Sequence, residues 1–119
     1  MWKILQTNQF GKWFVSPDYV DEDARVSIYA VMEVLKRMGP NLGRHYLDSV
    51  KGSRHENMKE LRVQSKGRPL RIFFAFDPLR RAVLLIGGNK TGDKRFYFRM
   101  IPIADMLYDD YLQDLGERK

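Results

Sequence analysis

Cationic side chains able to hold a phosphodiester recur between Met58 and Arg99, the stretch in which this sequence is most informative. Arginine binds phosphate through two parallel N–H groups and stays charged at any working pH. RNA carries its own nucleophile, the 2′-hydroxyl, so cleavage needs that group held in line, a base, an acid and cations around the phosphorane. A cationic cluster with one Lys, Tyr or His as proton carrier meets these needs without a metal ion. The candidate catalytic residues are Arg62, Arg71, Lys90, Lys94 and, either as a phosphate donor or as part of helix packing, Tyr97.

The positive charge is local. The 119-residue chain has a net charge of +6, but residues 51–99 hold 13 Lys or Arg against 4 Asp or Glu, a net of +9. Concentrated positive charge favours a polyanionic partner because each phosphate contact releases counterions. The alternative is a solvated basic surface that aids solubility. The candidate RNA-binding residues are Lys51, Arg54, His55, Lys59, Lys66, Arg68 and Arg95.

Structural interpretations remain open for several of these residues. Arg62 and Arg71 can pair across strands with Glu60, which accounts for one arginine and not for a whole cluster. His55 is either a phosphate contact or an ordinary surface histidine. The run Gly87–Gly92 resembles a phosphate loop but lacks the full GxxxxGK[ST] spacing, so it does not predict a nucleotide site.

Other chemistries have little support. The chain has no Cys, which excludes a Cys-based zinc site, a thiol nucleophile and disulfides. It has no obvious metal-binding carboxylate cluster, because the acids of residues 18–23 are typical of a helix start. We therefore expect no metal and no cofactor. No window approaches the roughly 18 apolar residues of a membrane helix, and the N-terminus does not resemble a signal peptide, so we expect a cytoplasmic protein without membrane contact.

The elements that must position these residues predict an α+β fold with one domain, residues 1–119. Strict alternation places Arg62 and Arg71 on the face opposite the main apolar set of each strand, so both emerge on one side of an antiparallel meander. The last helix is either broken or kinked at Pro102, and its Asp105, Asp109 and Asp110 are expected to face away from the core. No structure is assigned to residues 41–56. The expected elements are strands at 2–7, 58–64, 70–76 and 82–86, a helical hairpin at about 8–15 and 18–38, a loop at 87–94 and a C-terminal helix to about 115.

Four motifs in this order resemble one known family: HENMKELR (55–62), LRIFFAFDP (70–78), LLIGGNKTG (84–92) and IPIAD (101–105) with LYD (107–109). The chain is similar to the phage-derived, HigB-like branch of the RelE toxin superfamily. The resemblance implies a compact RelE-like fold, with an antiparallel, mixed-edge sheet of about four strands, an N-terminal helical hairpin and a C-terminal helix.

The resemblance also implies a function. Such proteins are toxins of type II toxin–antitoxin systems that cleave mRNA in the ribosomal A site. A helix-turn-helix, HigA-like antitoxin neutralises them, and operator DNA is bound only through the complex with that antitoxin. The implied catalytic positions are Arg62, Arg71 and Lys90, with Lys94 and Tyr97 as less specific transfers.

Two other functions fit the same fold. A ParE-like toxin poisons DNA gyrase, and a non-catalytic module binds RNA or the ribosome through phosphate contacts alone. The sequence departs from the family pattern at Phe98, where the resemblance implies a polar or charged residue. An aromatic ring there can stack on a base, contact the antitoxin or mark a weakened toxin.

Overall fold

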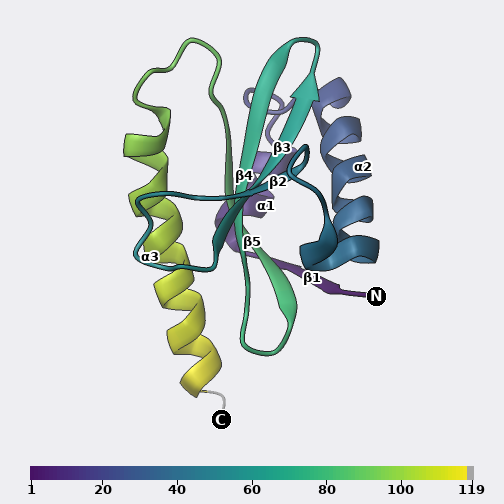
Figure 1. The fold of residues 1–119 in the computed structure, drawn as a ribbon. Helices are drawn as coiled ribbons and strands as arrows, with labels where there is room; N and C mark the ends of the chain where they lie inside the picture. Colours follow the sequence, from purple (N-terminus) through teal and green to yellow (C-terminus); the bar gives the residue numbers. More distant parts are fainter. Residues whose placement is uncertain (118–119) are drawn as a thin grey trace.

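A five-stranded mixed sheet forms the middle layer of the protein (Figure 1). The computed structural model describes residues 1–117. Strand order in the sheet is β1-β5-β4-β3-β2; β1 runs parallel to β5 and the other neighbours are antiparallel. The strands are β1 (Lys3–Gln6), β2 (Leu47–Ser49), β3 (Met58–Ser65), β4 (Arg68–Phe76) and β5 (Arg81–Asn89).

The expected antiparallel meander is confirmed, with one more strand than the four that the sequence indicated. The additional strand, β2, lies in the stretch 41–56 and spans only three residues. Lys66 and Gly67 connect β3 to β4, with φ angles of 52° and 76°. Positive φ at both central residues is the geometry of a two-residue hairpin turn whose twist matches the sheet.

Two helices cover one face of the sheet, α1 (Asn8–Val15) and α2 (Glu22–Met38). The side chain of Thr7 accepts a hydrogen bond of 3.0 Å from the backbone of Phe10 and so caps α1. Asp21 caps α2 by accepting a hydrogen bond of 2.9 Å from the backbone N–H of Ala24, so this helix begins at residue 22 and not at residue 18. A 3₁₀ turn, η1 (Gly39–Asn41), follows α2.

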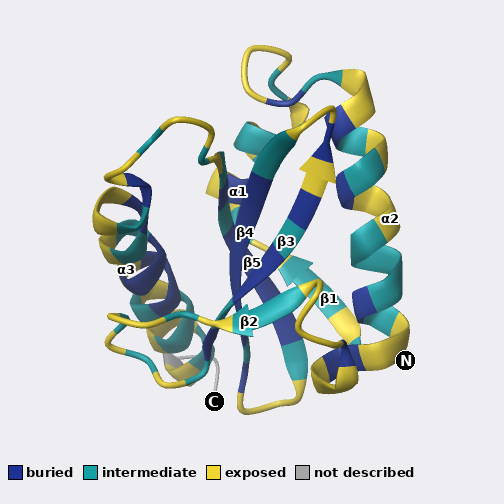
Figure 2. Ribbon diagram, turned by 45° about the horizontal axis from the view of Figure 1, so that its top comes forward, coloured by how far each residue is buried: buried dark blue, intermediate teal, exposed yellow. Residues whose placement is uncertain are grey.

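The opposite face is covered by α3 (Phe96–Glu117), one helix that contains Pro102 without a break. Strands β4 and β5 therefore lie between helices on both sides, which explains their nearly continuous burial (Figure 2). Asp105 is buried on α3, contrary to the expectation that it faces away from the core. Among residues 1–117, no helix is long and apolar enough to cross a membrane.

Two glycines of β5, Gly87 and Gly88, let helices on the two faces of the sheet pack closely against the strand. A Cβ on Gly87 would overlap the indole of Trp13 from α1, and a Cβ on Gly88 would lie 2.8 Å from Phe96 of α3. The expected loop at 87–94 is therefore wrong at its start, because β5 continues to Asn89. These glycines serve close packing on both faces of a strand.

Candidate nucleic-acid interface

A buried carboxylate organises the cationic residues of the sheet. Glu60 on β3 is only 4% exposed. Its Oε2 lies 3.4 Å from Arg62 Nη2, and its Oε1 lies 3.6 Å from Arg71 Nε. The pairing with Glu60 that the sequence suggested for one arginine therefore includes both.

Register explains why the two arginines meet. Arg62 and Arg71 are direct partners in the antiparallel pair β3–β4, and both project toward the face that α3 covers. Like charges directly opposite on two strands destabilise a sheet unless anions offset them. Glu60 supplies one such anion, and Asp48 on β2 supplies another by accepting 3.0 Å from Arg62.

Each of these guanidinium groups retains an unused donor. Among the described residues, the buried Nε–H groups of Arg62 and Arg71 have no hydrogen-bond acceptor. Buried polar atoms are almost always hydrogen-bonded, so an unpaired donor calls for an explanation. Arg71 Nε still forms the 3.6 Å ion pair with Glu60, although the distance is too long for a hydrogen bond. Two cationic donors without hydrogen bonds at register-paired positions are suited to an anionic ligand.

A cavity of about 380 Å³ opens over this group. Three cationic side chains line it, Lys51, Arg62 and Lys90, against the two carboxylates of Asp48 and Glu60, and Arg71 pairs with Glu60 from outside the lining, so positive charge is in excess. Arg62 also borders a neighbouring hollow of about 550 Å³ that includes His45 and Arg71. The cavity is lined by Asp48, Ser49, Val50, Lys51, Glu60, Arg62, Lys90 and Tyr97.

Tyr97 brings α3 to the cavity. Its phenol donates a hydrogen bond of 2.8 Å to Glu60 Oε1. Burial raises the pKa of the Tyr97 phenol and the bond to Glu60 raises it further, while Arg71 lowers it. The net pKa is above the ordinary value of 10.0, so the phenol keeps its proton at neutral pH.

The two candidate lysines differ in position. Lys90 Nζ lies 5.3 Å from the centre of the Tyr97 ring and lines the cavity. Lys94 is exposed in the turn before α3 and is not among the residues that line the cavity. The structure therefore brings together Arg62, Arg71, Lys90 and Tyr97 and leaves Lys94 at the margin.

The connection between β2 and β3 is held against α3. The carboxylate of Asp105 accepts from the Ser53 hydroxyl at 2.5 Å and from the Arg54 backbone at 3.0 Å. His55 Nε2 lies 2.7 Å from Asp109, which also pairs with the Arg54 guanidinium. Arg54 and His55 thus anchor the segment that carries Lys51, and their hydrogen bonds lower the pKa of Asp109, that from His55 most.

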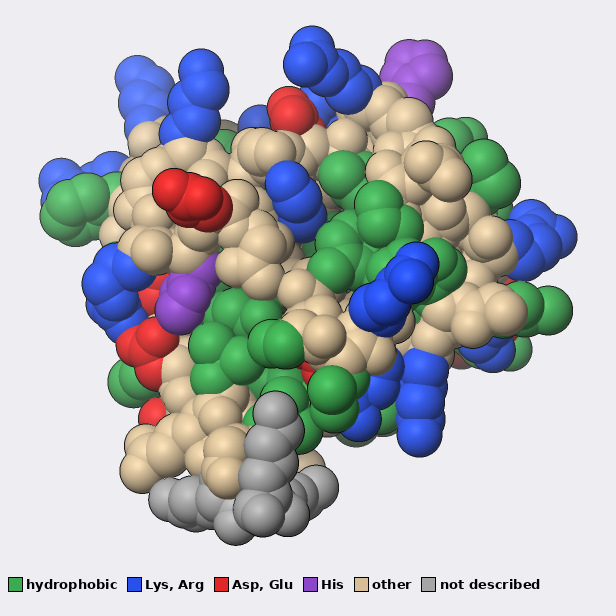
Figure 3. All heavy atoms as spheres, turned by 60° about the horizontal axis from the view of Figure 1, so that its bottom comes forward, with side chains coloured by type: hydrophobic (Ala, Val, Ile, Leu, Met, Phe, Trp, Pro, Cys, Tyr) green, Lys and Arg blue, Asp and Glu red, His purple; other side chains and the backbone are tan. Residues whose placement is uncertain are grey.

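On one face of the molecule, the Lys and Arg side chains do not form one continuous patch (Figure 3). They stand apart from one another, most of them around the rim and a few over the middle of the face, with hydrophobic side chains between them. The Lys59 ammonium donates a hydrogen bond of 2.9 Å to the hydroxyl of Ser49, a residue that lines the cavity. Arg95 lies 4.7 Å from the centre of the Phe98 ring on α3.

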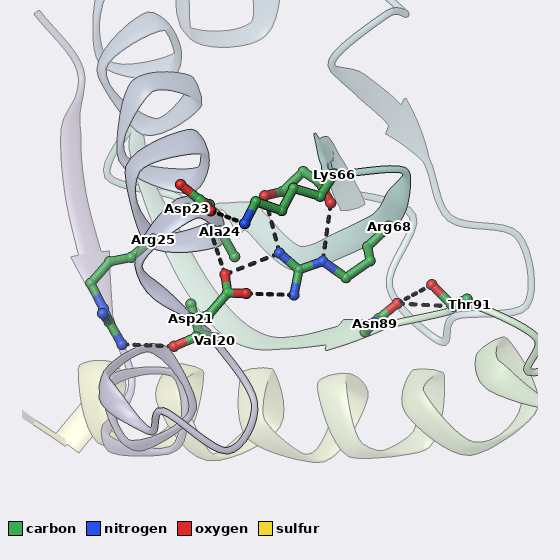
Figure 4. A network of polar contacts seen from close by, with 10 residues as sticks. Val20, Asp21, Asp23, Ala24, Arg25, Lys66, Arg68, Asn89 and Thr91 are labelled. Atoms are coloured by element: carbon green, nitrogen blue, oxygen red, sulfur yellow. Dashed lines mark hydrogen bonds and ion pairs between the residues drawn. The ribbon is translucent and has the colours of Figure 1, made fainter.

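Lys66 and Arg68 lie apart from the cavity, at the start of α2 (Figure 4). Arg68 donates two bonds, of 2.9 and 3.0 Å, to the two oxygens of Asp21, and Lys66 pairs with Asp23. The hydrogen bond from Arg68, followed by that from Ala24, lowers the pKa of Asp21 from 3.8 to about 2. These two cations stabilise the β3–β4 turn against the helix, and the structure does not bring them to the other candidate RNA-binding residues.

Sequence reasoning did not identify Glu60 or Asp48 as parts of the site. Glu60 lies two residues before Arg62 on the same strand, so alternation places both side chains on one face, and the sequence could have indicated its role. Its contact with Tyr97 depends on how α3 crosses the sheet, and Asp48 lies in a strand too short to show alternation. Within residues 1–117, no three His, Asp or Glu side chains gather in a group that could hold a metal ion.

The fold and the cavity define a class: a small basic α+β protein of RelE-like architecture with a cavity on its sheet that is lined by cationic side chains. Comparison with known proteins identifies the family. The family model described as "Phage derived protein Gp49-like" matches residues 18–109. The chain belongs to this family, and the expected HigB-like affiliation is confirmed.

Two relatives come from Mycobacterium tuberculosis. The chain is 44% identical over 110 residues to a protein named "Putative toxin HigB3", with 92% of each chain covered. It is 43% identical over 102 residues to "Putative toxin HigB2", covering 84% of this chain and 51% of that protein. The chain therefore spans about half the length of the second relative.

Proposed function

We propose that this protein is the toxin of a type II toxin–antitoxin pair and that it is a metal-independent endoribonuclease that cleaves mRNA on the ribosome. The observation that carries the proposal is the pair of unsatisfied Nε–H donors of Arg62 and Arg71 beside the Tyr97–Glu60 hydrogen bond. The names of its relatives support the toxin assignment. Such a toxin acts in the cytoplasm, where mRNA is translated.

In the proposed reaction, the scissile phosphate enters the cavity and accepts hydrogen bonds from Arg62 and Arg71. The 2′-oxygen attacks phosphorus, the P–O5′ bond breaks, and the products are a 2′,3′-cyclic phosphate and a 5′-hydroxyl. Arg62, Arg71 and Lys90 stabilise the charge that builds up on the phosphorane oxygens.

Proton transfer is assigned to the Tyr97–Glu60 pair and to Lys90. The raised pKa of Tyr97 disfavours a free phenolate. The phenol oxygen therefore accepts the proton of the 2′-hydroxyl as its own proton passes to Glu60 along their hydrogen bond. The leaving 5′-oxygen takes a proton from the ammonium group of Lys90.

The proposed partner is a helix-turn-helix, HigA-like antitoxin that neutralises the toxin. The complex of the two proteins, and not the toxin alone, would bind operator DNA. The helix-turn-helix protein is expected to be encoded beside the toxin, and its co-expression is expected to restore growth.

The test is inducible expression of the wild-type chain and of Arg71→Lys and Lys90→Ala variants, with Lys36→Ala as the control. Lys36 is a lysine of α2 that pairs with Glu33 and lies outside the cavity. We expect growth arrest and cleaved mRNA with cyclic-phosphate ends for the wild type and the control, and a loss of both for the two variants.

Three results would overturn parts of this proposal. Arrest with DNA damage and intact mRNA would indicate gyrase poisoning. Ribosome binding without cleavage by the purified protein would indicate a binding module. Cleavage abolished by a chelator and restored by a divalent cation would show that the reaction depends on a metal ion.

A further inference from the structure

A second, mostly apolar hollow lies beside the cationic cavity. Its volume is about 390 Å³, within the range of small-molecule sites. Four of its residues come from the first two turns of α3, and the fifth comes from the β2–β3 connection. The hollow is lined by Gly52, Tyr97, Phe98, Ile101 and Pro102.

Phe98 is the prominent side chain of this hollow. It is 74% exposed, although an aromatic ring of this size normally gains free energy by burial. The guanidinium of Arg95 lies 4.7 Å from the ring centre, and much of the ring remains open to solvent. Bases of single-stranded nucleic acids stack on exposed aromatic rings, and arginine adds cation–π contacts in such sites.

The hollow and the cationic cavity are adjacent. Tyr97 lines both of them, and the consecutive residues Lys51 and Gly52 line one each. A ligand held by its phosphate near Arg62 and Lys90 therefore has the hollow at its side. Gly52 has a φ of +91°, a conformation that favours glycine and keeps this wall free of a side chain.

The surroundings favour RNA over a protein as the occupant. Arg95 contacts the Phe98 ring, while Lys51 and Lys90 line the adjacent cationic cavity, where Lys90 contacts the Tyr97 ring. Cations interspersed with aromatic rings are characteristic of single-stranded nucleic-acid sites. A protein interface needs a far larger contiguous surface than this hollow offers.

We propose that Phe98 stacks on a nucleobase of the bound RNA and that the hollow is a base-binding subsite next to the scissile phosphate. This inference rests on the proposed function, because it takes the ligand of the cationic cavity to be RNA. Phe98 thereby contributes to affinity and to the choice of cleavage position, without any part in proton transfer.

The experiment measures binding of short, fluorescent 2′-fluoro oligonucleotides, which lack the nucleophile and cannot be cleaved. Each oligonucleotide is compared with versions that carry an abasic unit at one successive position. The proteins are the full-length wild type, Phe98→Ala, Phe98→Trp and the control Met106→Ala. Met106 is another exposed apolar side chain of α3 that does not line the hollow.

We expect Phe98→Ala to weaken binding of the intact oligonucleotide by about 5- to 100-fold. At one abasic position the wild type should lose the same factor, and Phe98→Ala should then have no additional effect. Phe98→Trp and Met106→Ala should bind like the wild type. The salt dependence of binding should be unchanged by Phe98→Ala, because no phosphate contact is lost.

Equal binding by wild type and Phe98→Ala, or an equal loss for intact and abasic oligonucleotides at every position, would overturn the subsite. Loss of antitoxin binding alone would assign the ring to a protein contact and would also overturn it. The outcome is separable from the proposed function. If Phe98→Ala lowered the affinity for intact but not for abasic oligonucleotides, and the protein cleaved no RNA, the nuclease would be refuted and the subsite retained. If Phe98→Ala changed neither RNA cleavage nor oligonucleotide affinity, the subsite would be refuted and the nuclease retained.

Discussion

The phenol of Tyr97 donates a hydrogen bond of 2.8 Å to Glu60, a residue 37 positions earlier in the chain. This bond joins α3 to β3 at the point where Glu60 also contacts Arg62 and Arg71. One buried carboxylate therefore holds two cations and a phenol in fixed positions. Preorganised donors of this kind stabilise developing charge without reorganisation during the reaction.

The first prediction concerns the phenol itself. Tyr97→Phe keeps the ring and removes the hydroxyl, so RNA cleavage should fall by about 10²- to 10⁴-fold, the usual contribution of a positioned proton carrier. Unfolding free energy should fall by about 1–3 kcal/mol, because Glu60 loses a partner while it remains buried. Cleavage assays and urea denaturation measure the two effects.

Tyr111→Phe is the matched control for that variant. The Tyr111 hydroxyl donates a hydrogen bond of 2.7 Å to the buried Asp77, and Tyr111 does not line the cationic cavity. This variant should lose stability and retain cleavage. Equal cleavage by Tyr97→Phe and Tyr111→Phe would assign Tyr97 to folding alone.

The second prediction concerns phosphate contacts. Lys90→Ala should weaken RNA binding similarly for all sequences and reduce the slope of log affinity against log salt by about 1. Lys36→Ala, at a half-exposed lysine outside the cavity, should leave the slope unchanged. A slope that is identical in the wild type and both variants would place Lys90 outside the phosphate path.

The third prediction concerns acid stability. Hydrogen bonds from Arg68 and from Ala24 lower the pKa of Asp21 to about 2, below its ordinary 3.8. A folded-state pKa below the unfolded value gives stability that is present above about pH 3.8 and is lost as the pH falls through about 2. Asp21→Asn should therefore flatten the fall in stability across this window and lower the melting temperature at neutral pH.

Circular dichroism during acid titration measures this effect, and Asp18→Asn is its control. Asp18 is an exposed carboxylate before the same helix and does not cap it. If both variants followed the acid titration of the wild type, the contact with Arg68 would have no part in acid stability.

The fourth prediction concerns the paired glycines of β5. Gly87→Ala should destabilise the protein by about 1–3 kcal/mol, since the added methyl group would overlap Trp13. Trp13→Leu in the same chain should recover part of that loss by making room. Gly43→Ala is the neutral control, because among the described residues nothing beyond its chain neighbours lies within 4 Å of the methyl group that this substitution adds.

Alternation along single strands was readable from the sequence, which is why the common face of Arg62 and Arg71 was predicted correctly. Contacts between distant elements were not. Lys66 and Arg68 lie in a turn that packs against the acids at the start of α2. The distribution of charge along the sequence does not show where a turn lies in space, so these two pairs could not be predicted from it. The extension of β5 through Gly87 and Gly88 could not be predicted for the same reason. The two glycines are favoured there because Trp13 and Phe96, from helices on the two faces of the sheet, pack against them.

The buried Asp105 has a mechanical consequence. It fastens the β2–β3 connection to α3, the same helix that carries Tyr97 and Phe98 about two turns earlier. Two parts of the cavity wall that are distant in the chain, the segment with Lys51 and the Tyr97 side chain, are thus attached to the same helix. Because both parts of the wall are attached to one helix, we expect the width of the cavity to vary little, so that a ligand would not have to order its own binding site.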